Sequence, residues 1–591
     1  MNINSRVEAL REWMKTHGVD AYLVPTADPH NSEYIAPHWM CREWLTGFTG
    51  SAGMAVVTLL DAALWTDSRY WLQAEQQLKD TPFCLMCEGR DDVPSPTEWL
   101  EKEAELSGKA LTIAGPADMM TCAMAEEAEQ AGMTLRTDLP DAFDALWTER
   151  PPLPAQPIEP QPEEWTGRWA WNKLQLVADT LDKQLTAPYY LFNDLADISW
   201  LLNLRGSDID YNPVFLAYLI YGKEERRFVL FTHPETLTPE ARQQLEQAEV
   251  GVAPYEEAAD FCHKYRVQAA ETVTAALHVA MEEPLESPVV MLRAQKNEAE
   301  CEGFRQAMLR DGVAMVQFLR RLDEAMASGQ RMTERSADEL LTSLRAAQPG
   351  FRELSFPTIA GYAAHGAIVH YEADEKTDAK LCPCGLLLLD SGAQFDCGTT
   401  DITRTIALGP TTEEERRVYT LVLKGHLALA RLRFPEGATG LQLDLAARRD
   451  LWAAGYDFGH GTGHGVGAHL CVHEGPHQIR KDLRQCTLVP FWPGMTVTDE
   501  PGVYVPGRFG VRIENVLLCR RAGETPFGRF LEFENLTLCP YDLRPVERAL
   551  LTAEEVAQIN AYHAEVCQRL LPLLTDEADR NWLLQATAPL A

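Results

Sequence analysis

The sequence predicts an α/β (α+β) protein in which two similar N-terminal units precede a larger C-terminal unit. The chain has 591 residues, which is more than a single hydrophobic core usually organises. Helix-like and strand-like patterns alternate from the N-terminus, are interrupted by a proline cluster at 151–162, and then begin again in the same order. These observations indicate several α/β domains in series.

The first 150 residues show this alternation. RVEALREWMKTHG has apolar residues at helical spacing and stops at Gly18, and DAYLVP follows as a strand. Two short strands in GMAVVTLLDAALWTD then precede another helix, RYWLQAEQQL. We therefore assign 1–150 to a first domain. We expect 151–164 to be a stiff linker, because dense proline prevents helices and central strands.

Residues 165–288 predict a second domain with the same order of elements. The helix LQLVADTLDKQL, the strand APYYLFN and the helix ADISWLLNLRG, which ends at Gly206, are followed by two paired strands. The segments REWLTGFTG and ISWLLNLRG share an aromatic–leucine core before a glycine. The repeated order favours a diverged duplication.

A third domain is predicted at 289–545, and it opens with a long amphipathic helix near residue 290. The residues able to do chemistry lie inside it, between 365 and 514. Beyond it, 546–591 carries another amphipathic helix, LTAEEVAQINAYHAEVCQRLLPLL. Terminal helices of this kind are usually core but frequently form dimer interfaces, so we expect a helical extension and a homodimer.

Composition excludes several classes of partner. The chain has 53 basic and 87 acidic residues, a formal net charge of −34, which repels nucleic acid and acidic membranes. It contains no run of ~20 apolar residues to span a membrane, and its first residues do not resemble a secretory signal. The 14 cysteines follow no metal-site spacing, so we expect reduced thiols in a cytoplasmic protein.

Two aspartates are predicted at neighbouring strands. LLLLDSG indicates a buried strand that ends at Asp390, and TTDITRTIAL indicates its hairpin partner, which begins near Asp401. Carboxylates brought together repel each other unless a cation or a proton intervenes. Aspartates are also common at strand ends, so this pair alone leaves both interpretations open.

Two glutamates follow in MTVTDEPG and VRIENVLL. Glu500 comes directly after one strand, and Glu514 lies among the apolar residues of another. A charged side chain in such a strand is costly unless it is paired or bound to a metal. Arg512 lies two residues before Glu514, on the same strand face, and is its simplest partner.

The stretch HGTGHGVG at 460–467 places two histidines among glycines. It matches neither phosphate-loop pattern, and its glycines would cost a zinc-protease helix about 1 kcal/mol each. Alternate glycines suit an extended segment that another backbone or a ligand approaches closely. His460 and His464 would then point to the same side, with His370 and His473 as further histidines nearby in the sequence.

Asp390, Asp401, His464, Glu500 and Glu514 form an oxygen-rich set that favours Mn²⁺ or Co²⁺ over Zn²⁺. Four carboxylates offset the charge of two divalent ions. Such a pair of ions is suited to hydrolysis by a bridging hydroxide at a polarised carbonyl. A serine-hydrolase site is not indicated, since TGSAG at 49–53 lacks the first glycine of the nucleophile elbow.

The ordered motifs DSG, DxTRT, HGTGHGVG, TDEPG and RIEN resemble those of the pita-bread metallopeptidases. The similarity is greatest to the Xaa-Pro aminopeptidases (aminopeptidase P) of the long, three-domain cytosolic form. It extends to LTGFTGSAG and WTDSRYWLQA in the first domain and to FENLTLCPYD near the C-terminus. The resemblance implies two creatinase-like N-terminal α/β domains followed by a C-terminal pita-bread metallopeptidase domain.

The resemblance also implies roles for the site residues. Asp390 and Asp401 would hold one metal ion, and Asp401, His464, Glu500 and Glu514 the other, with Asp401 and Glu514 shared. Glu500 would accept the proton of the nucleophile, and Arg512 would orient Glu514. Three histidines would face the substrate: His370, His460 and His473. His365 and Cys397, beside the ligands, depart from the pattern of the family.

The expected function is hydrolysis of the N-terminal Xaa-Pro bond of a peptide whose second residue is proline, with two Mn²⁺ ions, or Co²⁺ or Zn²⁺ instead. A prolidase would share the metal site but take dipeptides. A creatinase-like amidinohydrolase would need no metal, and a non-catalytic binding protein on the same fold typically loses ligands. The presence of all five ligands favours the aminopeptidase.

Overall fold

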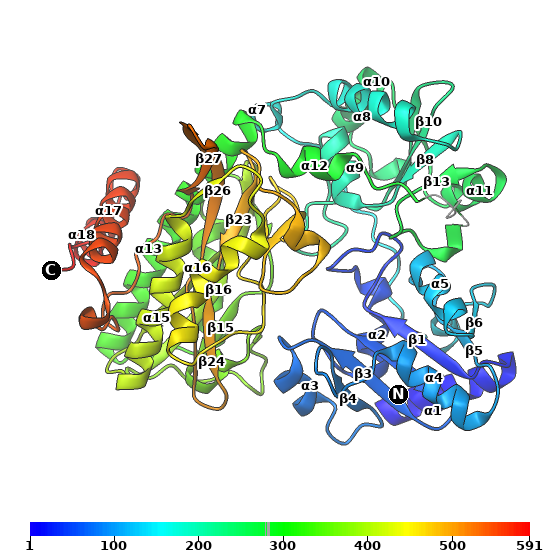
Figure 1. Cartoon of the computed structure of the whole chain (residues 1–591), viewed down its shortest axis with the longest axis horizontal. Helices are drawn as coiled ribbons and strands as arrows, with labels where there is room; N and C mark the ends of the chain where they lie inside the picture. Colours follow the sequence, from blue (N-terminus) through cyan, green and yellow to red (C-terminus); the bar gives the residue numbers. More distant parts are fainter. Residues whose placement is uncertain (278, 280–283) are drawn as a thin grey trace. The chain divides into compact units, whose positions relative to one another are not determined.

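The computed structural model describes residues 1–277, 279 and 284–591 (Figure 1). The chain divides into two compact units, Met1–Gln161 with Arg168–Val289 (unit 1) and Pro162–Gly167 with Val290–Ala591 (unit 2). This division is coarser than the predicted one, since unit 1 contains both N-terminal sheets and unit 2 contains the C-terminal extension. The boundaries expected at 150, 164, 288 and 545 stay predictions.

The first sheet of unit 1 has six strands in the order β4-β3-β2-β1-β5-β6. Strand β1 pairs antiparallel with β2 and parallel with β5. The strands are β1 (Ala21–Pro25), β2 (Met54–Thr58), β3 (Ala62–Thr66), β4 (Cys84–Cys87), β5 (Thr112–Ala114) and β6 (Thr134–Arg136). The helices are α1 (Ile3–His17), η1 (Pro37–Trp39), α2 (Cys41–Thr46), α3 (Trp71–Gln77), α4 (Pro96–Ser107), α5 (Cys122–Gln130) and α6 (Ala142–Leu146).

The second sheet of unit 1 has five strands in the order β12-β11-β10-β8-β13. The strands are β8 (Tyr189–Phe192), β10 (Tyr218–Gly222), β11 (Arg227–Thr232), β12 (Gly251–Pro254) and β13 (Val267–Gln268). The helices are α8 (Ala170–Gln184), α9 (Leu195–Leu202), η2 (Pro234–Thr236), α10 (Pro239–Gln247), α11 (Glu257–Lys264) and η3 (Ala275–Leu277).

The two sheets share one topology. Counted along the chain, the first five strands of each have the same spatial order and the same sequence of parallel and antiparallel pairs. The first sheet adds β6 at its edge. This agreement is what the duplication predicted from the sequence requires.

Part of the proline-rich segment, which was expected to be a linker, packs within unit 1. Ile158 is buried, and β7 (Glu159–Pro160) pairs antiparallel with β9 (Leu204–Arg205). Proline is tolerated at such an edge because its missing N–H can face away from the partner. Helix α9, which directly precedes β9, was expected to end at Gly206. It ends instead at Asn203, which has a left-handed conformation, because the next two residues belong to β9.

Unit 2 contains the predicted catalytic domain. Its strands are β14 (Phe351–Leu354), β15 (Ile359–Tyr362), β16 (Leu386–Ser391), β17 (Ala393–Phe395), β18 (Gly398–Thr399), β19 (Ile402–Ala407), β20 (Arg433–Pro435), β21 (Gly463–Gly465), β22 (Glu474–Ile479), β23 (Thr496–Asp499), β24 (Gly502–Val505), β25 (Phe509–Arg512), β26 (Asn515–Thr525) and β27 (Gly528–Asn535). Its helices are α7 (Glu163–Thr166), α12 (Val289–Ala294), α13 (Glu298–Ser328), α14 (Glu334–Ala346), η4 (Ala363–Ala367), α15 (Glu413–Ala430), α16 (Gly440–Ala453), η5 (Gln485–Leu488), η6 (Arg548–Leu550), α17 (Ala553–Leu570) and α18 (Glu577–Ala586).

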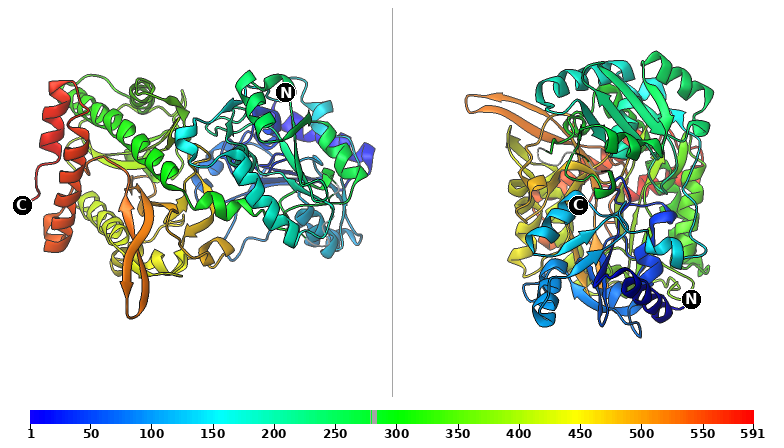
Figure 2. Two further views of the ribbon diagram at one scale, coloured as in Figure 1. Left: turned by 90° about the horizontal axis from the view of Figure 1, so that it is seen from above. Right: turned by 90° about the vertical axis from the view of Figure 1, so that its right-hand side faces the viewer.

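The core of unit 2 lies between short sheets and long helices. The apolar faces of α13, α15 and α17 join strands β24 and β25 in one buried cluster, and α13 and α14 cover β15, β16 and β19 in another. Helices α17 and α18 lie beside α13, and the β26–β27 hairpin (orange) extends from the body of the unit (Figure 2). The site described below lies where the short strands of this core end.

No helix among the described residues is long and apolar enough to cross a membrane. None of the 14 cysteines, all of which lie in the described parts of the chain, forms a disulfide.

Candidate metal centre

The first two predicted ligands lie side by side, as the sequence predicts. Strands β16 and β19 pair antiparallel, with Asp390 opposite Thr403. Asp401 directly precedes β19, so both carboxylates lie at the same end of this pair. Both aspartates are buried, at 7% and 4% exposure.

The two glutamates reach the same place from other strands. Glu500 follows β23, and its backbone N–H donates to the carbonyl of Thr462 at 2.9 Å. Glu514 lies in the break between β25 and β26, and its N–H donates to the carbonyl of Thr403 at 3.1 Å. Thr462 lies two residues before His464 and Thr403 two residues after Asp401, so these backbone bonds anchor each glutamate next to another predicted ligand.

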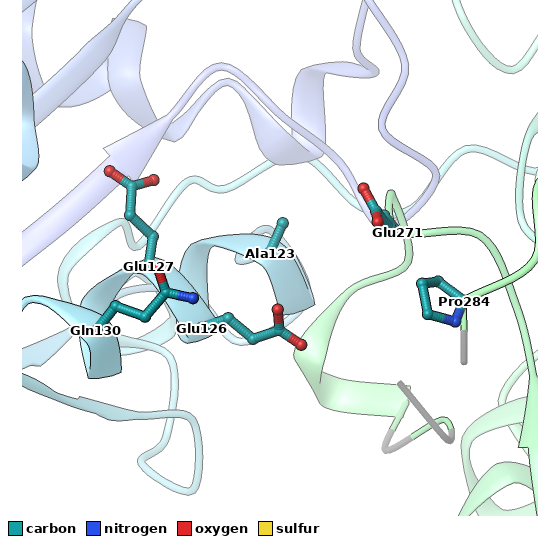
Figure 3. A pocket seen from close by; sticks show the side chains of 6 residues that line it. All are labelled: Ala123, Glu126, Glu127, Gln130, Glu271 and Pro284. Atoms are coloured by element: carbon teal, nitrogen blue, oxygen red, sulfur yellow. The ribbon is translucent and has the colours of Figure 1, made fainter. Parts of the chain in front are cut away.

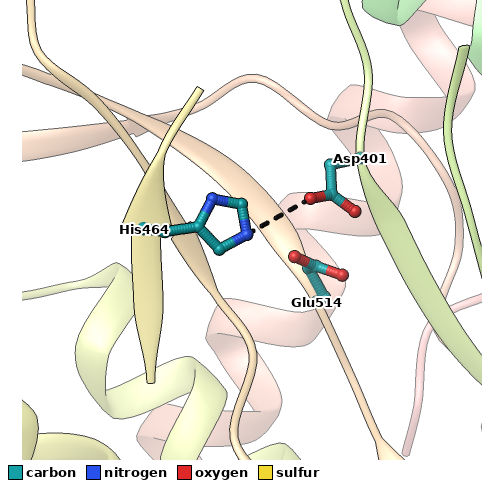
Figure 4. Close-up of side chains that lie close together, drawn as sticks. All are labelled: Asp401, His464 and Glu514. Carbon is teal, nitrogen blue, oxygen red and sulfur yellow. Dashed lines mark ion pairs between the residues drawn. The ribbon is translucent and has the colours of Figure 1, made fainter. Parts of the chain in front are cut away.

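His464 completes the group. Its Nε2 lies 3.5 Å from Asp401 Oδ2 and 3.5 Å from Glu500 Oε1. Ligand atoms of Asp401, His464 and Glu514 all lie within 4.8 Å of one another, and Figure 4 shows the three side chains converging. His464 Nδ1 is 2.9 Å from the carbonyl of Gly465. A proton on Nδ1 donates this bond and leaves Nε2 free to act as a ligand.

The buried carboxylates of this group lie close enough together to destabilise one another's charged forms, and bound cations would relieve this repulsion. Burial, and then the neighbouring carboxylates, raise the pKa of Asp401 and of Glu514 well above the usual range. Burial likewise raises the pKa of Glu500 to about 7. Asp390 Oδ1 is buried and accepts no hydrogen bond from any residue that the structure describes. Carboxylate and imidazole donors crowded in this way, with an unsatisfied buried oxygen, fit divalent cations.

Arg512 has a different partner from the one expected. Its Nη2 lies 2.6 Å from Asp390 Oδ2, and its Nε lies 3.0 Å from the same oxygen. Glu514 instead accepts a hydrogen bond from the hydroxyl of Thr403 at 2.7 Å. The expected Arg512–Glu514 pairing is wrong because β25 ends at Arg512, so Glu514 no longer shares its strand face.

His460 is also placed differently from the prediction. Strand β21 covers only Gly463–Gly465, and His460 lies in a bend before it, so the two histidines do not share one strand face. His460 Nε2 instead contacts the hydroxyl of Tyr504 at 2.7 Å, and its Nδ1 is 3.9 Å from Glu500 Oε2. Burial, followed by the charge of Arg512, lowers the pKa of His460 well below its usual value.

Of the other two histidines, His473 contacts a member of the group directly, and His370 is adjacent in the chain to a residue that Arg512 contacts. The ring of His473 meets that of His464 edge-on, with centroids 4.3 Å apart. His370 lies in the turn after η4, next to Val369, whose carbonyl accepts a hydrogen bond from Arg512 Nη2 at 3.3 Å. His365 and Cys397, the two departures from the family pattern, lie in η4 and before β18 respectively, outside the group.

Close packing explains the glycines between the histidines. A Cβ on Gly463 would collide with the carbonyl of Thr498, and one on Gly465 with the carbonyl of Glu474. The backbones of β23 and β22 therefore pass close to the two residues that precede and follow His464. The close approach of another backbone is the reason predicted for this composition.

Comparison with known proteins agrees with this geometry. Residues 302–521 match the model of metallopeptidase family M24, and 529–590 match the C-terminal region of that family. Residues 6–143 and 149–300 each match a creatinase/prolidase N-terminal domain. A probable Xaa-Pro aminopeptidase P of Aspergillus fumigatus is 37% identical, across 100% of this chain and 93% of that protein.

The chain belongs to metallopeptidase family M24. Xaa-Pro aminopeptidase 1 of Dictyostelium discoideum is also 37% identical, over 100% of this chain and 97% of its own length. The X-prolyl aminopeptidase of Caenorhabditis elegans, described as a cytosolic enzyme with a di-nuclear active site, has a TM-score of 0.94 at 33% identity, with 100% of both chains covered. These matches confirm the predicted fold class and the resemblance to Xaa-Pro aminopeptidases.

Sequence reasoning missed Arg404 in this M24 chain. Its side chain is buried on β19 and donates to the carbonyl of Glu514 at 2.7 Å. It also donates to Asn515 Oδ1 at 2.9 Å and to the hydroxyl of Tyr562, on α17, at 3.1 Å. An arginine within the apolar strand ITRTIA was the signal, because such a charge must find several acceptors.

Tyr504 was missed as well. Its hydroxyl lies between His460 Nε2 at 2.7 Å and Arg512 Nη1 at 2.6 Å. It therefore connects a predicted substrate-side histidine to the arginine that holds Asp390. A tyrosine in the apolar strand GVYV gives no sequence signal for this role.

A separate pocket of about 250 Å³ lies in unit 1 and contains none of the predicted site residues (Figure 3). Three glutamates, one glutamine, one alanine and one proline line it: Glu126, Glu127, Glu271, Gln130, Ala123 and Pro284.

Proposed function

We propose that this chain is a metal-dependent aminopeptidase that hydrolyses the N-terminal Xaa-Pro bond and releases the first residue of a peptide. The observation that carries the proposal is the convergence of the Asp401, Glu500 and Glu514 carboxylates on His464 Nε2, with Asp390 on the strand paired with the one that follows Asp401. Relatives named Xaa-Pro aminopeptidase that match the whole chain supply the substrate class. Retention of every predicted ligand argues against a non-catalytic role.

Two divalent cations, Mn²⁺ in the first instance, would occupy this centre. Asp390 and Asp401 would hold one, and Asp401, His464, Glu500 and Glu514 the other. When bound, ions of this kind lower the pKa of water and polarise a carbonyl group. The di-nuclear active site described for the Caenorhabditis elegans relative supports the number, and the donor chemistry supports Mn²⁺ or Co²⁺ ahead of Zn²⁺.

The chain's own residues would orient the peptide and handle its protons. Glu500, whose Oε1 lies 3.5 Å from His464 Nε2 and whose Oε2 lies 3.9 Å from His460 Nδ1, would accept the proton of the nucleophile. His460 is uncharged near neutral pH because burial lowers its pKa, so its Nε2 and the Tyr504 hydroxyl can share a hydrogen bond with substrate. His370 and His473 would flank the scissile bond. Burial of the centre strengthens these contacts.

The test is release of the N-terminal residue from an Xaa-Pro-Yaa peptide by chelated and then Mn²⁺-restored protein. We expect activity only after restoration, with Xaa-Pro dipeptide and Xaa-Ala-Yaa peptide cleaved far more slowly. Absence of metal-dependent release would refute the proposal, and preference for the dipeptide would make the protein a prolidase. Co²⁺ and Zn²⁺ in parallel reactions identify the preferred ion.

Variants test the residue assignments. Asp401→Ala and His464→Ala should abolish turnover and lower metal content while the circular dichroism spectrum is kept. His460→Ala should lower kcat with metal content retained. If His460→Ala lost metal and His464→Ala kept it, the roles of the two histidines would have to be exchanged.

We also propose a cytoplasmic homodimer. The description of the Caenorhabditis elegans relative as cytosolic supports the location. Leu573 and Leu584, beside and on α18, are exposed at 47% and 49% and could meet a second copy through the C-terminal extension. Sedimentation of the wild-type protein and of Leu584→Glu tests this: the wild type should be a dimer and the variant a monomer.

A further inference from the structure

The segment that carries His370 is held by a buried carboxylate to which the proposed function gives no role. This segment, 362–371, leaves the end of β15 and passes through η4. Strand β15 pairs with β16, with Ile359 opposite Asp390. The 362–371 segment starts three residues further along β15, at Tyr362, which lies opposite Leu387.

Glu334 is the carboxylate concerned. It is the first residue of α14, and its side chain is 0% exposed. It accepts hydrogen bonds from two backbone N–H groups and two side chains: Tyr362 N at 2.7 Å, His365 Nδ1 at 2.9 Å, Tyr371 Oη at 2.9 Å and Ala379 N at 2.9 Å. Three of these four donors belong to the 362–371 segment, one at each end and one in the middle.

The bond from His365 is charge-assisted. Glu334 raises the pKa of the His365 imidazole, and the ring of His365 stacks on that of Tyr371 with centroids 4.5 Å apart. Hydrogen bonds to an ionised acceptor are about twice as strong as neutral ones. Glu334 therefore holds the middle of the segment, through His365, as well as its two ends.

The conformation of the segment requires such support. Ala363 has a φ of 51°, in the left-handed region that a residue with a Cβ adopts only when its surroundings impose it. A Cβ on Gly361 would meet Gly366, and one on Gly510, in β25, would collide with the carbonyl of Gly366. The segment is thus folded tightly on itself and against β25.

The segment also contacts the arginine that holds Asp390. The carbonyl of Val369, one residue before His370, accepts a hydrogen bond from Arg512 Nη2 at 3.3 Å. The same nitrogen lies 2.6 Å from Asp390 Oδ2. Glu334 and Arg512 therefore both hold the segment, and His370 lies between Val369, which Arg512 contacts, and Tyr371, which Glu334 contacts.

We propose that Glu334 is a positioning residue for the reaction: it fixes the 362–371 segment and thereby the place of His370 beside the metal centre. The inference rests on the proposed function for the role of His370. Glu334 itself would contact neither metal nor substrate. It acts through the backbone on both sides of His370.

The variant for the test is Glu334→Gln, which keeps size and removes charge. In either orientation its amide NH₂ would face a backbone N–H, of Tyr362 or of Ala379, where Glu334 now accepts. Glu339→Gln is the matched control, because Glu339 is an exposed residue of the same helix. Tyr371→Phe removes a single donor to Glu334 and provides a milder variant should Glu334→Gln not fold.

The first readout is hydrogen–deuterium exchange, which requires no catalysis. We expect exchange in 362–371 to become about tenfold faster in Glu334→Gln, and less so in Tyr371→Phe. Exchange in β16 and β19 should stay as in the wild type, and Glu339→Gln should change neither region. Unchanged exchange in 362–371 would overturn the inference, whether or not the protein has the proposed activity.

The second readout is a double-mutant cycle with His370→Ala on an Xaa-Pro-Yaa peptide, using Mn²⁺-loaded proteins of equal metal content. Glu334→Gln should lower kcat about 10- to 100-fold in the wild-type background and less than about threefold in the His370→Ala background. Equal losses in both backgrounds would show a general structural role and overturn the inference. If the wild type itself failed to cleave the peptide, the proposed function would fail and the exchange measurement would still decide whether Glu334 holds the segment.

Discussion

Gly463→Ala is the substitution for which the structure sets the sharpest expectation. Gly463 begins β21 and directly precedes His464. A Cβ at this position would collide with the backbone carbonyl of Thr498, in β23. Since a strand carbonyl cannot rotate away like a side chain, β21 has to move from β23 and take His464 with it.

The size of the effect follows from two terms. Forcing a methyl group into a close-packed interior lowers the free energy of unfolding by about 1–3 kcal/mol. Loss of the 3.0 Å hydrogen bond from His464 N to Thr498 Oγ1 removes about 1 kcal/mol more. A shift of about 1 Å at a catalytic group costs on the order of 100-fold in rate. We therefore expect about 2–4 kcal/mol of destabilisation and a large loss of turnover.

The measurements are urea unfolding, bound Mn²⁺ after dialysis, and kcat/KM on an Xaa-Pro-Yaa peptide. Gly461→Ala is the control in the same motif, because the atoms nearest to its Cβ would belong to the flexible Arg480 side chain, the closest being Cγ at 3.2 Å. We expect that control to stay within about 0.5 kcal/mol of the wild type. Normal metal content and turnover in Gly463→Ala would refute the assignment of His464 and of the glycine beside it.

Three further predictions follow from buried polar groups. Tyr504→Phe removes the hydroxyl bonded to His460, so kcat should fall about tenfold with bound metal unchanged; loss of metal would show a different role. Lys296→Met leaves the fully buried carboxylate of Glu474 without its hydrogen-bonded lysine, and the free energy of unfolding in urea should fall by about 3–5 kcal/mol; a change below about 1 kcal/mol would contradict the pairing. Burial lowers the pKa of His477 to about 4, so between about pH 6.5 and 4 the unfolded chain binds a proton that the folded chain does not. Stability should therefore be lost as pH falls through that window, by about 3 kcal/mol for this residue, and His477→Gln should flatten the pH dependence of the unfolding free energy.

Local patterns predicted the features that depend on one strand and its neighbour. The pairing that places Asp390 near Asp401 followed from two apolar runs with a turn between them. The position of Glu500 after a strand followed in the same way. The duplication of the N-terminal sheets was visible because element order survives sequence divergence.

The features that the sequence did not predict depend on which strands pair in the folded protein. The break between Arg512 and Glu514 arises because β25 pairs with β24 while β26 pairs with β23 and β27. A strand that changes partners in this way still appears as one continuous apolar run in the sequence. The bend at His460 likewise depends on Tyr504, which lies 44 residues further along the chain.

The hydrogen bonds of Arg404 determine when the support of Glu514 can form during synthesis of the chain. Arg404 joins the backbone of Glu514 to the hydroxyl of Tyr562, on α17, which follows every predicted metal ligand in the sequence. During synthesis the ribosome releases that helix after every predicted metal ligand. The support behind Glu514 is therefore completed only after Tyr562 has been made, later than the synthesis of every predicted metal ligand.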